Sequence, residues 1–413
     1  MQMPDAKPAT PSLLFVIDRD FGSLGLVMYL LHKQPLAIRA KLIMPRIQFD
    51  LHAGGLSVAA LPYDSVDDVI TVIETEKPGS VLLFSGYSFV DQNLFDYPSL
   101  RRLIDTIHHC ACTLATSDPY LGTYTEIPHQ FWVDGAMERR LMPLLPRLAR
   151  SEFVSRLDNW IFQRKVIPYR RIAALLEDAI HLCANLTACI NNGSIQYRSF
   201  YNSQFLREDT ELQSISNTIS AFSDVSSDWP RWLFVIANFD LEYQRQLYGD
   251  RRFSEIVVEK MRDAIACRKH PTLIASPTLI DDVALMLGDE PNASFVQQCG
   301  FAEFELRLLD AEIAFYWQLY STSSFLRLMN GLPVFFFDQG HVQRLLPRLY
   351  ETGLEFYFIA DPPIMLDASL PLVADELLAY KNSFAESAAK TQRQLQAVLS
   401  PEELFAELLD DQP

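Results

Sequence analysis

The chain has 413 residues, of which 49% are hydrophobic and 21% are charged, and its formal net charge is −17. This length suits two domains of ordinary size, and the composition supplies buried cores without signs of general disorder. The acidic balance argues against nucleic acid as the main partner, because binding a phosphate backbone requires clustered Lys and Arg.

The first 115 residues alternate between short apolar runs and segments with helical spacing. The apolar runs, which are typical of strands buried on both faces, are 13–17, 37–44, 56–61, 80–84 and 112–115. The segments with helical spacing are 24–32, 66–75 and 100–109. This alternation predicts a parallel sheet, because parallel neighbours need a long crossover connection.

The middle of the chain has a different pattern. Residues 138–191 carry apolar side chains at helical spacing, which predicts a helical insertion. The stretch that follows is rich in Ser, Asn and Asp, and we place an interdomain linker there, at 201–228.

The second half of the chain returns to alternating strands and helices. The expected strands are 231–237, 272–275, 293–296, 312–317 and 332–337. The expected helices are 255–267, 279–287, 301–309, 323–330 and 342–350, with amphipathic helices again at 372–399.

These patterns predict an α/β protein of two Rossmann-like parallel-sheet domains that face a cleft, with a helical insertion in the middle. The expected parts are an N-terminal domain at 1–200 that includes the helical region 138–191, a linker at 201–228, a C-terminal domain at 229–360, and helices at 361–413 that pack back on the N-terminal domain.

The sequence also favours a cytoplasmic protein. No segment reaches the roughly 18 apolar residues that span a bilayer, so we expect no transmembrane segment. Residues 1–11 are polar and Pro-rich, unlike a signal peptide. The six cysteines are scattered without metal-type spacing, which predicts free thiols in a reducing compartment.

Ligands of open parallel sheets bind beyond the carboxyl ends of the strands, so the loops there are the candidate sites. In the first such loop, 18–25, Gly22 and Gly25 permit close backbone approach, and the helix start behind them can receive an anionic group. Asp20 in this loop is a candidate catalytic carboxylate. The alternative is a tight turn with solvated acidic residues.

The loop after the last strand of the first half, 116–129, mixes hydroxyl, aromatic and titratable residues. Such a mixture binds sugar-like acceptors, and Asp118 or His129 could act as a general base. The alternative for Asp118 is a structural one, in which it caps the turn before Pro119.

Two further loops of the second half carry polar residues after neighbouring strands. The hydroxyl residues Ser321, Thr322, Ser323 and Ser324 precede a helix, where they either cap free N–H groups or hold a pyrophosphate. The next strand is followed by Asp338, Gln339 and His341, a pattern that binds adjacent sugar hydroxyls or forms an ordinary polar turn.

The region 323–341 resembles the donor-binding region of GT-B glycosyltransferases. The likeness rests on the hydroxyl turn at Ser323 and Ser324, the Gly331-Leu332-Pro333 step, the apolar strand after it and Asp338-Gln339. The helix and strand at 301–317 also resemble the elements that precede this region in that superfamily. Element order extends the resemblance over 12–360, whereas motif identity is confined to 323–341.

The resemblance implies a metal-independent glycosyltransferase that uses a nucleotide-sugar as co-substrate and no other cofactor. The C-terminal domain would hold the donor, with residues 321–324 at the phosphates and Asp338, Gln339 and His341 at the sugar. The N-terminal domain would present a small-molecule, glycan or peptide acceptor to a base. A second copy of the chain or a separate protein is left open as a further partner.

The sequence departs from the family pattern at three positions. Many members carry a His and a Gly before the hydroxyl turn and a Glu about three residues into the helix, where this chain has Gln318, Tyr320 and Leu326. Two alternatives therefore stand beside transfer: an epimerase or hydrolase of a nucleotide-sugar, and a catalytically inactive GT-B-like binding or partner subunit.

Overall fold

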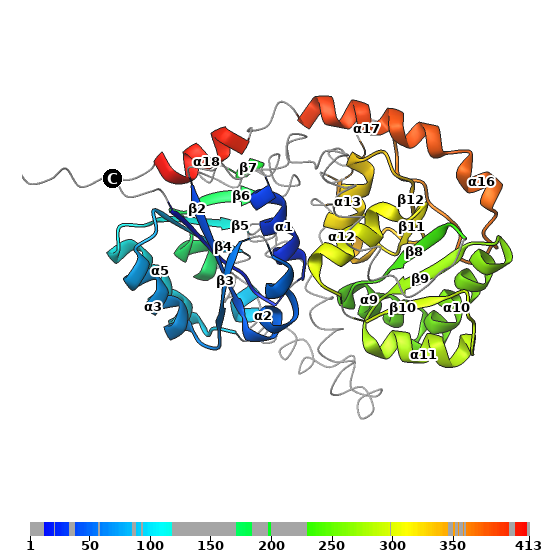
Figure 1. Ribbon diagram of the computed structural model, residues 1–413, viewed down its shortest axis with the longest axis horizontal. Helices are drawn as coiled ribbons and strands as arrows, with labels where there is room; N and C mark the ends of the chain where they lie inside the picture. Colours follow the sequence, from blue (N-terminus) through cyan, green and yellow to red (C-terminus); the bar gives the residue numbers. More distant parts are fainter. Residues whose placement is uncertain are drawn as a thin grey trace, which may run out of the picture. The chain divides into compact units, whose positions relative to one another are not determined.

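A computed structural model of the chain divides into two compact units, residues 1–201 with 398–413 and residues 202–397. The structure describes residues 12–19, 21–32, 38–56, 58–84, 88–91, 94–117, 171–183, 197–199, 229–297, 299–345, 350–351, 354, 358, 361–395 and 401–410. Each unit is an α/β structure built on a parallel sheet, as the sequence predicts (Figure 1). None of the helices in these ranges is long and apolar enough to cross a membrane.

The sheet of the first unit has seven strands in the order β3-β2-β1-β4-β5-β6-β7. The strands are β1 Ser12–Val16, β2 Arg39–Pro45, β3 Ala59–Tyr63, β4 Ser80–Phe84, β5 Thr113–Ser117, β6 Ile180–Cys183 and β7 Tyr197–Ser199. The connecting helices are α1 Phe21–His32, α2 Arg46–His52, η1 Ala53–Gly55, α3 Val66–Glu76, α4 Ser88–Asp91 and α5 Tyr97–His109. Every residue of β4 is buried, because the central strand of a parallel sheet is covered on both faces.

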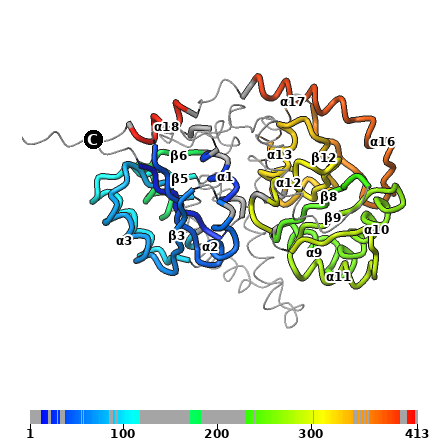
Figure 2. The backbone as a smooth tube through the Cα atoms, viewed as in Figure 1, coloured from blue at the N-terminus to red at the C-terminus, as the bar shows by residue number. Residues whose placement is uncertain are grey.

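The second unit has a five-stranded parallel sheet in the order β10-β9-β8-β11-β12. Its strands are β8 Arg231–Val235, β9 His270–Ile274, β10 Ser294–Val296, β11 Ile313–Tyr316 and β12 Val334–Phe336. Its helices are α9 Asn238–Tyr248, α10 Asp250–Ala266, α11 Pro277–Leu287, α12 Phe301–Asp310, α13 Thr322–Met329, α14 His341–Leu345, α16 Ala374–Leu378 and α17 Lys381–Leu395. Figure 2 follows this unit from β8, in green, to α17, in orange.

A stack of aromatic rings forms the centre of the second unit. Phe315 lies between Phe234, at a centroid distance of 4.8 Å, and Phe337, at 5.7 Å. The ring of Trp317 lies 4.7 Å from that of Phe337, so the stack extends to the carboxyl ends of β11 and β12. This packing holds the loops that follow these strands on a rigid support.

The last helix, α18 Pro401–Asp410, belongs to the first unit, whereas α16 and α17 belong to the second. Leu404, Phe405 and Leu408 of α18 are buried, and the Ser80 hydroxyl donates a hydrogen bond to the Leu408 carbonyl. The expectation that all of 361–413 packs on the N-terminal domain is therefore too broad, because α17 instead packs against α13 of its own unit.

The expected helical insertion at 138–191 is wrong over its described end. Residues 171–175 are helical, but residues 180–183 form β6, which pairs with β5 through Ala115 and Ile180. Strand β6 lies between β5 and β7, and its adjacent residues His181 and Leu182 are both buried. The sequence pattern missed it because the apolar spacing before it continued a helical pattern across the turn. The rest of the insertion and the linker at 201–228 lie outside the described residues.

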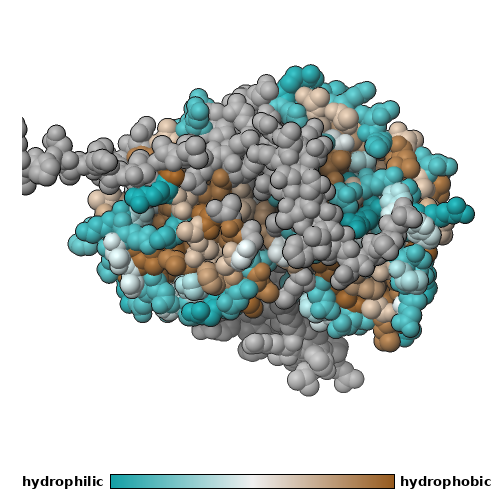
Figure 3. Space-filling model, in the orientation of Figure 1, coloured by the Kyte–Doolittle hydropathy of each residue, from teal (hydrophilic) through white to brown (hydrophobic). Residues whose placement is uncertain are grey.

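Figure 3 shows that hydrophilic and hydrophobic residues are mixed on the visible face of each unit. The described cysteines Cys110, Cys112, Cys267 and Cys299 are free thiols, as the sequence predicts. Burial raises the pKa of Cys112 to about 11 and that of Cys299 to about 12, so neither thiol is a reactive thiolate at neutral pH.

Candidate functional site

The carboxyl edge of the second sheet gathers polar side chains from three parts of the chain. Helix α9, which follows β8, contributes Asp240 and Gln244, whose side chains are 3% and 0% exposed. The loops after β11 and β12 contribute Gln318 and the segment 338–341. Because β11 lies between β8 and β12 in the sheet, these three contributions meet at one place.

The carboxylate of Asp338 is held in a fixed orientation. The amide Nε2 of Gln244 donates to Oδ2 of Asp338 at 3.1 Å, and the backbone N–H of Gly340 donates to Oδ1 at 2.9 Å. The same Nε2 lies 3.5 Å from the carbonyl oxygen of Trp317. Each oxygen of Asp338 therefore keeps a further lone pair that can accept a hydrogen bond from a bound hydroxyl.

Gly340 allows the turn after β12 to approach the end of β11 closely. Its φ of 83° lies in the left-handed region, and a Cβ atom there would lie 2.6 Å from Cβ of Gln318 and 2.9 Å from Cα of Gln318. A glycine is the residue that permits both the backbone conformation and the close approach.

The imidazole of His341 lies beside the carboxylate of Asp240 at this edge. Nδ1 of His341 lies 3.4 Å from Oδ1 of Asp240, and the ring of Tyr243 presents its edge to the imidazole at a centroid distance of 6.4 Å. Burial raises the pKa of Asp240, and the interaction with His341 opposes that shift. A buried carboxylate with a shifted pKa beside a histidine is typical of a functional site.

The hydroxyl residues before α13 are largely engaged with the protein itself. Tyr316 donates its hydroxyl to Oγ of Ser323 at 3.1 Å, and the hydroxyls of Ser321 and Ser323 lie 2.8 Å apart. Ser324 is fully buried and donates to the carbonyl oxygens of Leu319 and Ser321. A phosphate at this position would therefore meet the free backbone N–H groups in the first turn of α13, which includes Thr322, more than the serine hydroxyls.

In the first unit, the glycines predicted to line a loop lie in helix α1. The helix begins at Phe21, so Gly22 and Gly25 fall within its first two turns, and the expected loop 18–25 is shorter than the sequence suggested. Asp18 is fully buried, which contradicts the alternative of a solvated acidic turn. Apolar packing of α1 explains the early start, because residues 23–25 are already buried.

Two side chains fix the backbone between β1 and α1. The hydroxyl of Tyr63 donates to the carbonyl of Ile17 at 2.9 Å, and Nε2 of Gln48 donates to the carbonyl of Arg19 at 2.7 Å. Burial and the charge of Asp18 raise the pKa of Tyr63. The predicted catalytic residues Asp20, Asp118 and His129 lie outside the described part of the chain.

Sequence reasoning missed Asp240 and Gln244, because it did not predict helix α9. The sequence does carry a sign of this helix, because Asp240 and Gln244 are four residues apart and Leu241 lies next to Asp240. Polar residues at i and i+4 share one face of a helix, and on a buried face they indicate a polar contact with another element.

The buried carboxylate of Asp240 has a cost that can be measured. Because the pKa of Asp240 is raised, the folded protein binds the proton of this carboxyl group more tightly than the unfolded chain does. The protonated carboxyl group therefore contributes to stability at low pH, and this contribution is lost as the pH rises through the pKa of the folded state. We expect Asp240→Asn to raise the free energy of unfolding at pH 7.5 and the gain to shrink toward about pH 4. Urea unfolding at the two pH values measures it.

Asp367→Asn is the matched control in the same unit. Hydrogen bonds from the side chain and backbone of Ser369 lower the pKa of Asp367, so its contribution is present at neutral pH and lost as the pH falls. This substitution should therefore change the stability at pH 7.5 in the opposite direction. A loss of stability at pH 7.5 in Asp240→Asn contradicts the assignment of a destabilising buried charge.

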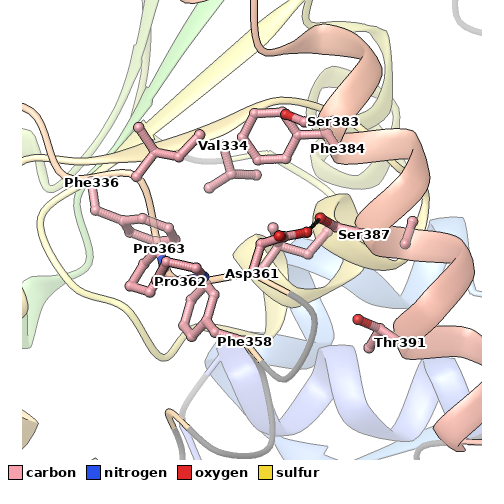
Figure 4. Close-up of a pocket in the computed structure, with 13 residues that line it drawn as sticks. Val334, Phe336, Phe358, Asp361, Pro362, Pro363, Ser383, Phe384, Ser387 and Thr391 are labelled. Atoms are coloured by element: carbon pink, nitrogen blue, oxygen red, sulfur yellow. Dashed lines mark hydrogen bonds between the residues drawn. The ribbon is translucent and has the colours of Figure 1, made fainter.

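A hollow also opens between β12, α13 and α17, away from the polar cluster. It has a volume of about 60 Å³ and is lined mainly by apolar side chains, among them Val334, Phe336, Phe358 and Phe384 (Figure 4). The carboxylate of Asp361 at its side accepts a hydrogen bond from the Ser387 hydroxyl. This carboxylate is thus engaged with a side chain of α17.

Within the described ranges, no three His, Cys, Asp or Glu side chains are grouped so that they could hold a metal ion.

The structure was compared with known proteins. It matches a UDP-GlcNAc 2-epimerase from Neisseria meningitidis bound to UDP-GlcNAc, with a TM-score of 0.54 and 11% identity over 97% of this chain and 100% of the other. It also matches the Methanocaldococcus jannaschii UDP-GlcNAc 2-epimerase in complex with UDP-GlcNAc and UDP, with a TM-score of 0.51 and 10% identity over 97% and 99% of the two chains. The glycosyltransferase VinC in complex with DTDP gives 0.50 and 10% over 97% and 98%.

These likenesses establish the fold. The chain has the GT-B architecture of two parallel-sheet α/β domains, which confirms the fold that the sequence predicts. No protein-family model matches the sequence, and a search of curated proteins found no match. The protein is thus a divergent chain with the GT-B fold.

Proposed function

We propose that this protein is a cytoplasmic glycosyltransferase that binds a nucleotide-sugar at the carboxyl edge of its second sheet. The observation that carries this proposal is the oriented carboxylate of Asp338, which Gln244 and the N–H of Gly340 hold from two sides. Carboxylate oxygens that are fixed in this way suit hydrogen bonds from the hydroxyl groups of a sugar. Gln339, the next residue in the chain, adds an amide to the same turn. The GT-B fold supports the same assignment.

In the proposed reaction, a hydroxyl of a small-molecule, glycan or peptide acceptor attacks the anomeric carbon of the donor. A base takes the hydroxyl proton, the bond from the anomeric carbon to the diphosphate breaks, and the nucleoside diphosphate leaves with the bonding electrons. The candidate bases are Asp20, Asp118 and His129 of the first unit. We propose no metal and no cofactor besides the donor.

A second candidate is an epimerase or hydrolase of a nucleotide-sugar, because solved structures with this fold include UDP-GlcNAc 2-epimerases. Incubation of the protein with the donor alone separates the two reactions. A transferase keeps the donor intact, a hydrolase releases the nucleoside diphosphate, and an epimerase changes the sugar without releasing it.

A protein that is inactive when pure and active in the presence of cell lysate indicates the third candidate, a partner-dependent subunit.

Binding of the nucleotide part is the first result to test. We expect one nucleoside diphosphate among UDP, dTDP, GDP, ADP and CDP to raise the melting temperature, by several degrees at a concentration of about 100 times its Kd. Differential scanning fluorimetry of the full chain measures this. If none of the five changes the melting temperature at millimolar concentration, the protein does not use a donor of this class.

A matched pair of variants locates the sugar within the site. Asp338→Asn removes the charge and keeps the shape, and we expect it to weaken binding of the complete nucleotide-sugar about tenfold or more while binding of the nucleoside diphosphate alone changes little. Asp361→Asn at the hollow beside α17 is the control and should leave both affinities unchanged. Equal loss of both ligands in Asp338→Asn contradicts a role at the sugar.

A further inference from the structure

The segments that leave the carboxyl edge of the second sheet carry acidic charge and contain no Lys or Arg. They are residues 236–238, 275–276, 297–300, 317–321 and 337–341. Their one carboxylate is Asp338, and their one titratable base, His341, lies beside Asp240. Asp240 adds a second carboxylate nearby, because it lies one helical turn before Gln244, whose amide bonds to Asp338.

Asp338 has no positively charged partner among the described residues. Both of its hydrogen bonds come from neutral donors, the amide of Gln244 and the N–H of Gly340. The arginines of the neighbouring helices α9 and α13 are engaged elsewhere, since Arg245 pairs with a carboxylate of α11 and Arg327 donates to backbone carbonyls. The carboxylate of Asp338 therefore has room for a cation that a ligand brings.

The neighbourhood of Asp338 also holds more acceptors than donors. The side chain of Gln244 is fully buried, and its Nε2 faces two acceptors, Asp338 and the carbonyl of Trp317. These partners fix the orientation of the amide, and they leave its Oε1 buried without a hydrogen bond from any described residue. Asp338, unlike Gln244 and Asp240, is partly exposed, so it is the acidic group of this edge that a ligand can contact.

An ammonium group matches this edge because it carries a positive charge and only donors, whereas a hydroxyl group is neutral. We propose that the sugar of the nucleotide-sugar carries a free amino group, and that Asp338 binds this group as an ammonium ion. Gln244 is then a positioning residue that orients the carboxylate. The diphosphate, which is negatively charged, is assigned to the backbone N–H groups at the start of α13. This inference rests on the proposed function and refines it, because that function leaves the kind of sugar open.

The test compares sugars that differ in one group on the same nucleotide. The nucleotide is the one whose diphosphate gives the largest thermal shift, and the full chain is used at about pH 6.5, where an amine is protonated. Isothermal titration calorimetry measures its glucose derivative beside the 2-amino, 3-amino and 4-amino derivatives. We expect at least one amino sugar to bind about tenfold to a hundredfold more tightly than glucose, because a charged hydrogen bond replaces a neutral one. N-acetylation of that amine removes the charge and should abolish the gain.

Variants of Asp338 test whether this carboxylate recognises the charge. Asp338→Asn keeps the shape and should abolish the preference for the amino sugar, while binding of the nucleoside diphosphate alone changes little. Asp338→Glu keeps the charge and should retain more of the preference than Asp338→Asn. Asp367→Asn is the matched control in the same unit, because this carboxylate is exposed and bonded to Ser369, and it should leave the preference unchanged. The melting temperature of each variant shows that it is folded.

The outcomes distinguish this inference from the proposed function. If no nucleoside diphosphate binds the unaltered protein, both are wrong. If the diphosphate binds and none of the three amino sugars binds more tightly than glucose, the donor site stands and the amino sugar is overturned. A preference for the amino sugar that persists in full in Asp338→Asn overturns the inference as well, because another group then recognises the ammonium.

Discussion

Replacing Arg327 by methionine should lower the free energy of unfolding by about 3 kcal/mol, among the larger effects of a single substitution. The guanidinium is fully buried in α13 and donates to the carbonyl oxygens of Leu308, Ala311 and Pro333. The Leu308 carbonyl loses its usual helical partner, because the N–H of Glu312 bonds to Arg231 instead. Without Arg327, several carbonyls at the end of α12 are buried without a donor.

Burial of the charge acts in the opposite direction. It lowers the pKa of Arg327 to about 10, so methionine removes a desolvation cost at the same time as it removes the hydrogen bonds. We expect the loss of the carbonyl partners to dominate, because one planar guanidinium serves several of them at once. Arg327→Lys keeps the charge but not the fork of donors and should also destabilise the unit.

Arg307→Met is the matched control for this prediction. Arg307 lies on α12, and its pair with Glu303 is partly exposed, so the substitution should cost less than about 1 kcal/mol. Chemical denaturation followed by tryptophan fluorescence measures all three variants. Equal stability of Arg327→Met and the unaltered protein contradicts the prediction and shows that the desolvation cost cancels the hydrogen bonds.

Replacing Gly340 by alanine should lower the free energy of unfolding by about 2 to 3 kcal/mol and abolish nucleotide-sugar binding. The added Cβ would lie 2.9 Å from Cα of Gln318, a backbone atom that cannot rotate away. The turn must therefore move, and the N–H of Gly340 leaves the carboxylate of Asp338. A site that loses its geometry by about an ångström loses much of its binding energy.

Gly249→Ala separates backbone strain from this collision. Gly249 has a φ of 82°, almost the same as that of Gly340, but no described atom lies within 4 Å of its added Cβ. With its ψ of 151°, it lies in a backbone region that is essentially restricted to glycine, so it should show only the cost of that conformation, about 1 to 3 kcal/mol, with unchanged ligand binding. Similar melting temperatures and affinities in the two variants would mean that Gln318 does not confine Gly340.

Much of the fold could be predicted from residue patterns. The strand expected at 80–84 is β4 without change, because a strand covered on both faces is a short run of apolar residues. The elements around the second sheet were placed within a few residues for the same reason. Helix α9 was not predicted, because its buried face carries Asp240 and Gln244, and polar residues there interrupt the apolar spacing.

The candidate site was predictable in part. Asp338, Gln339 and His341 follow a buried strand, and that position alone marks them as candidates. Their partners were not predictable, because Gln244 and Asp338 are 94 residues apart and meet only when β8, β11 and β12 pair. For the serines at 321–324 the sequence was misleading, because it suggests hydroxyl groups that are accessible to a ligand, whereas Ser323 and Ser324 are buried in the fold.

The sequence by itself determined the two parallel α/β sheets and the edge of the second one where polar groups gather, because burial of strands and crossover connections are recorded in local patterns of apolar residues. Only the tertiary structure decided which polar groups face one another: Gln244 with Asp338, and Asp240 with His341. Hydrogen bonds and ion pairs depend on distances of a few ångströms between residues that are far apart in the chain, and those distances exist only in the folded protein.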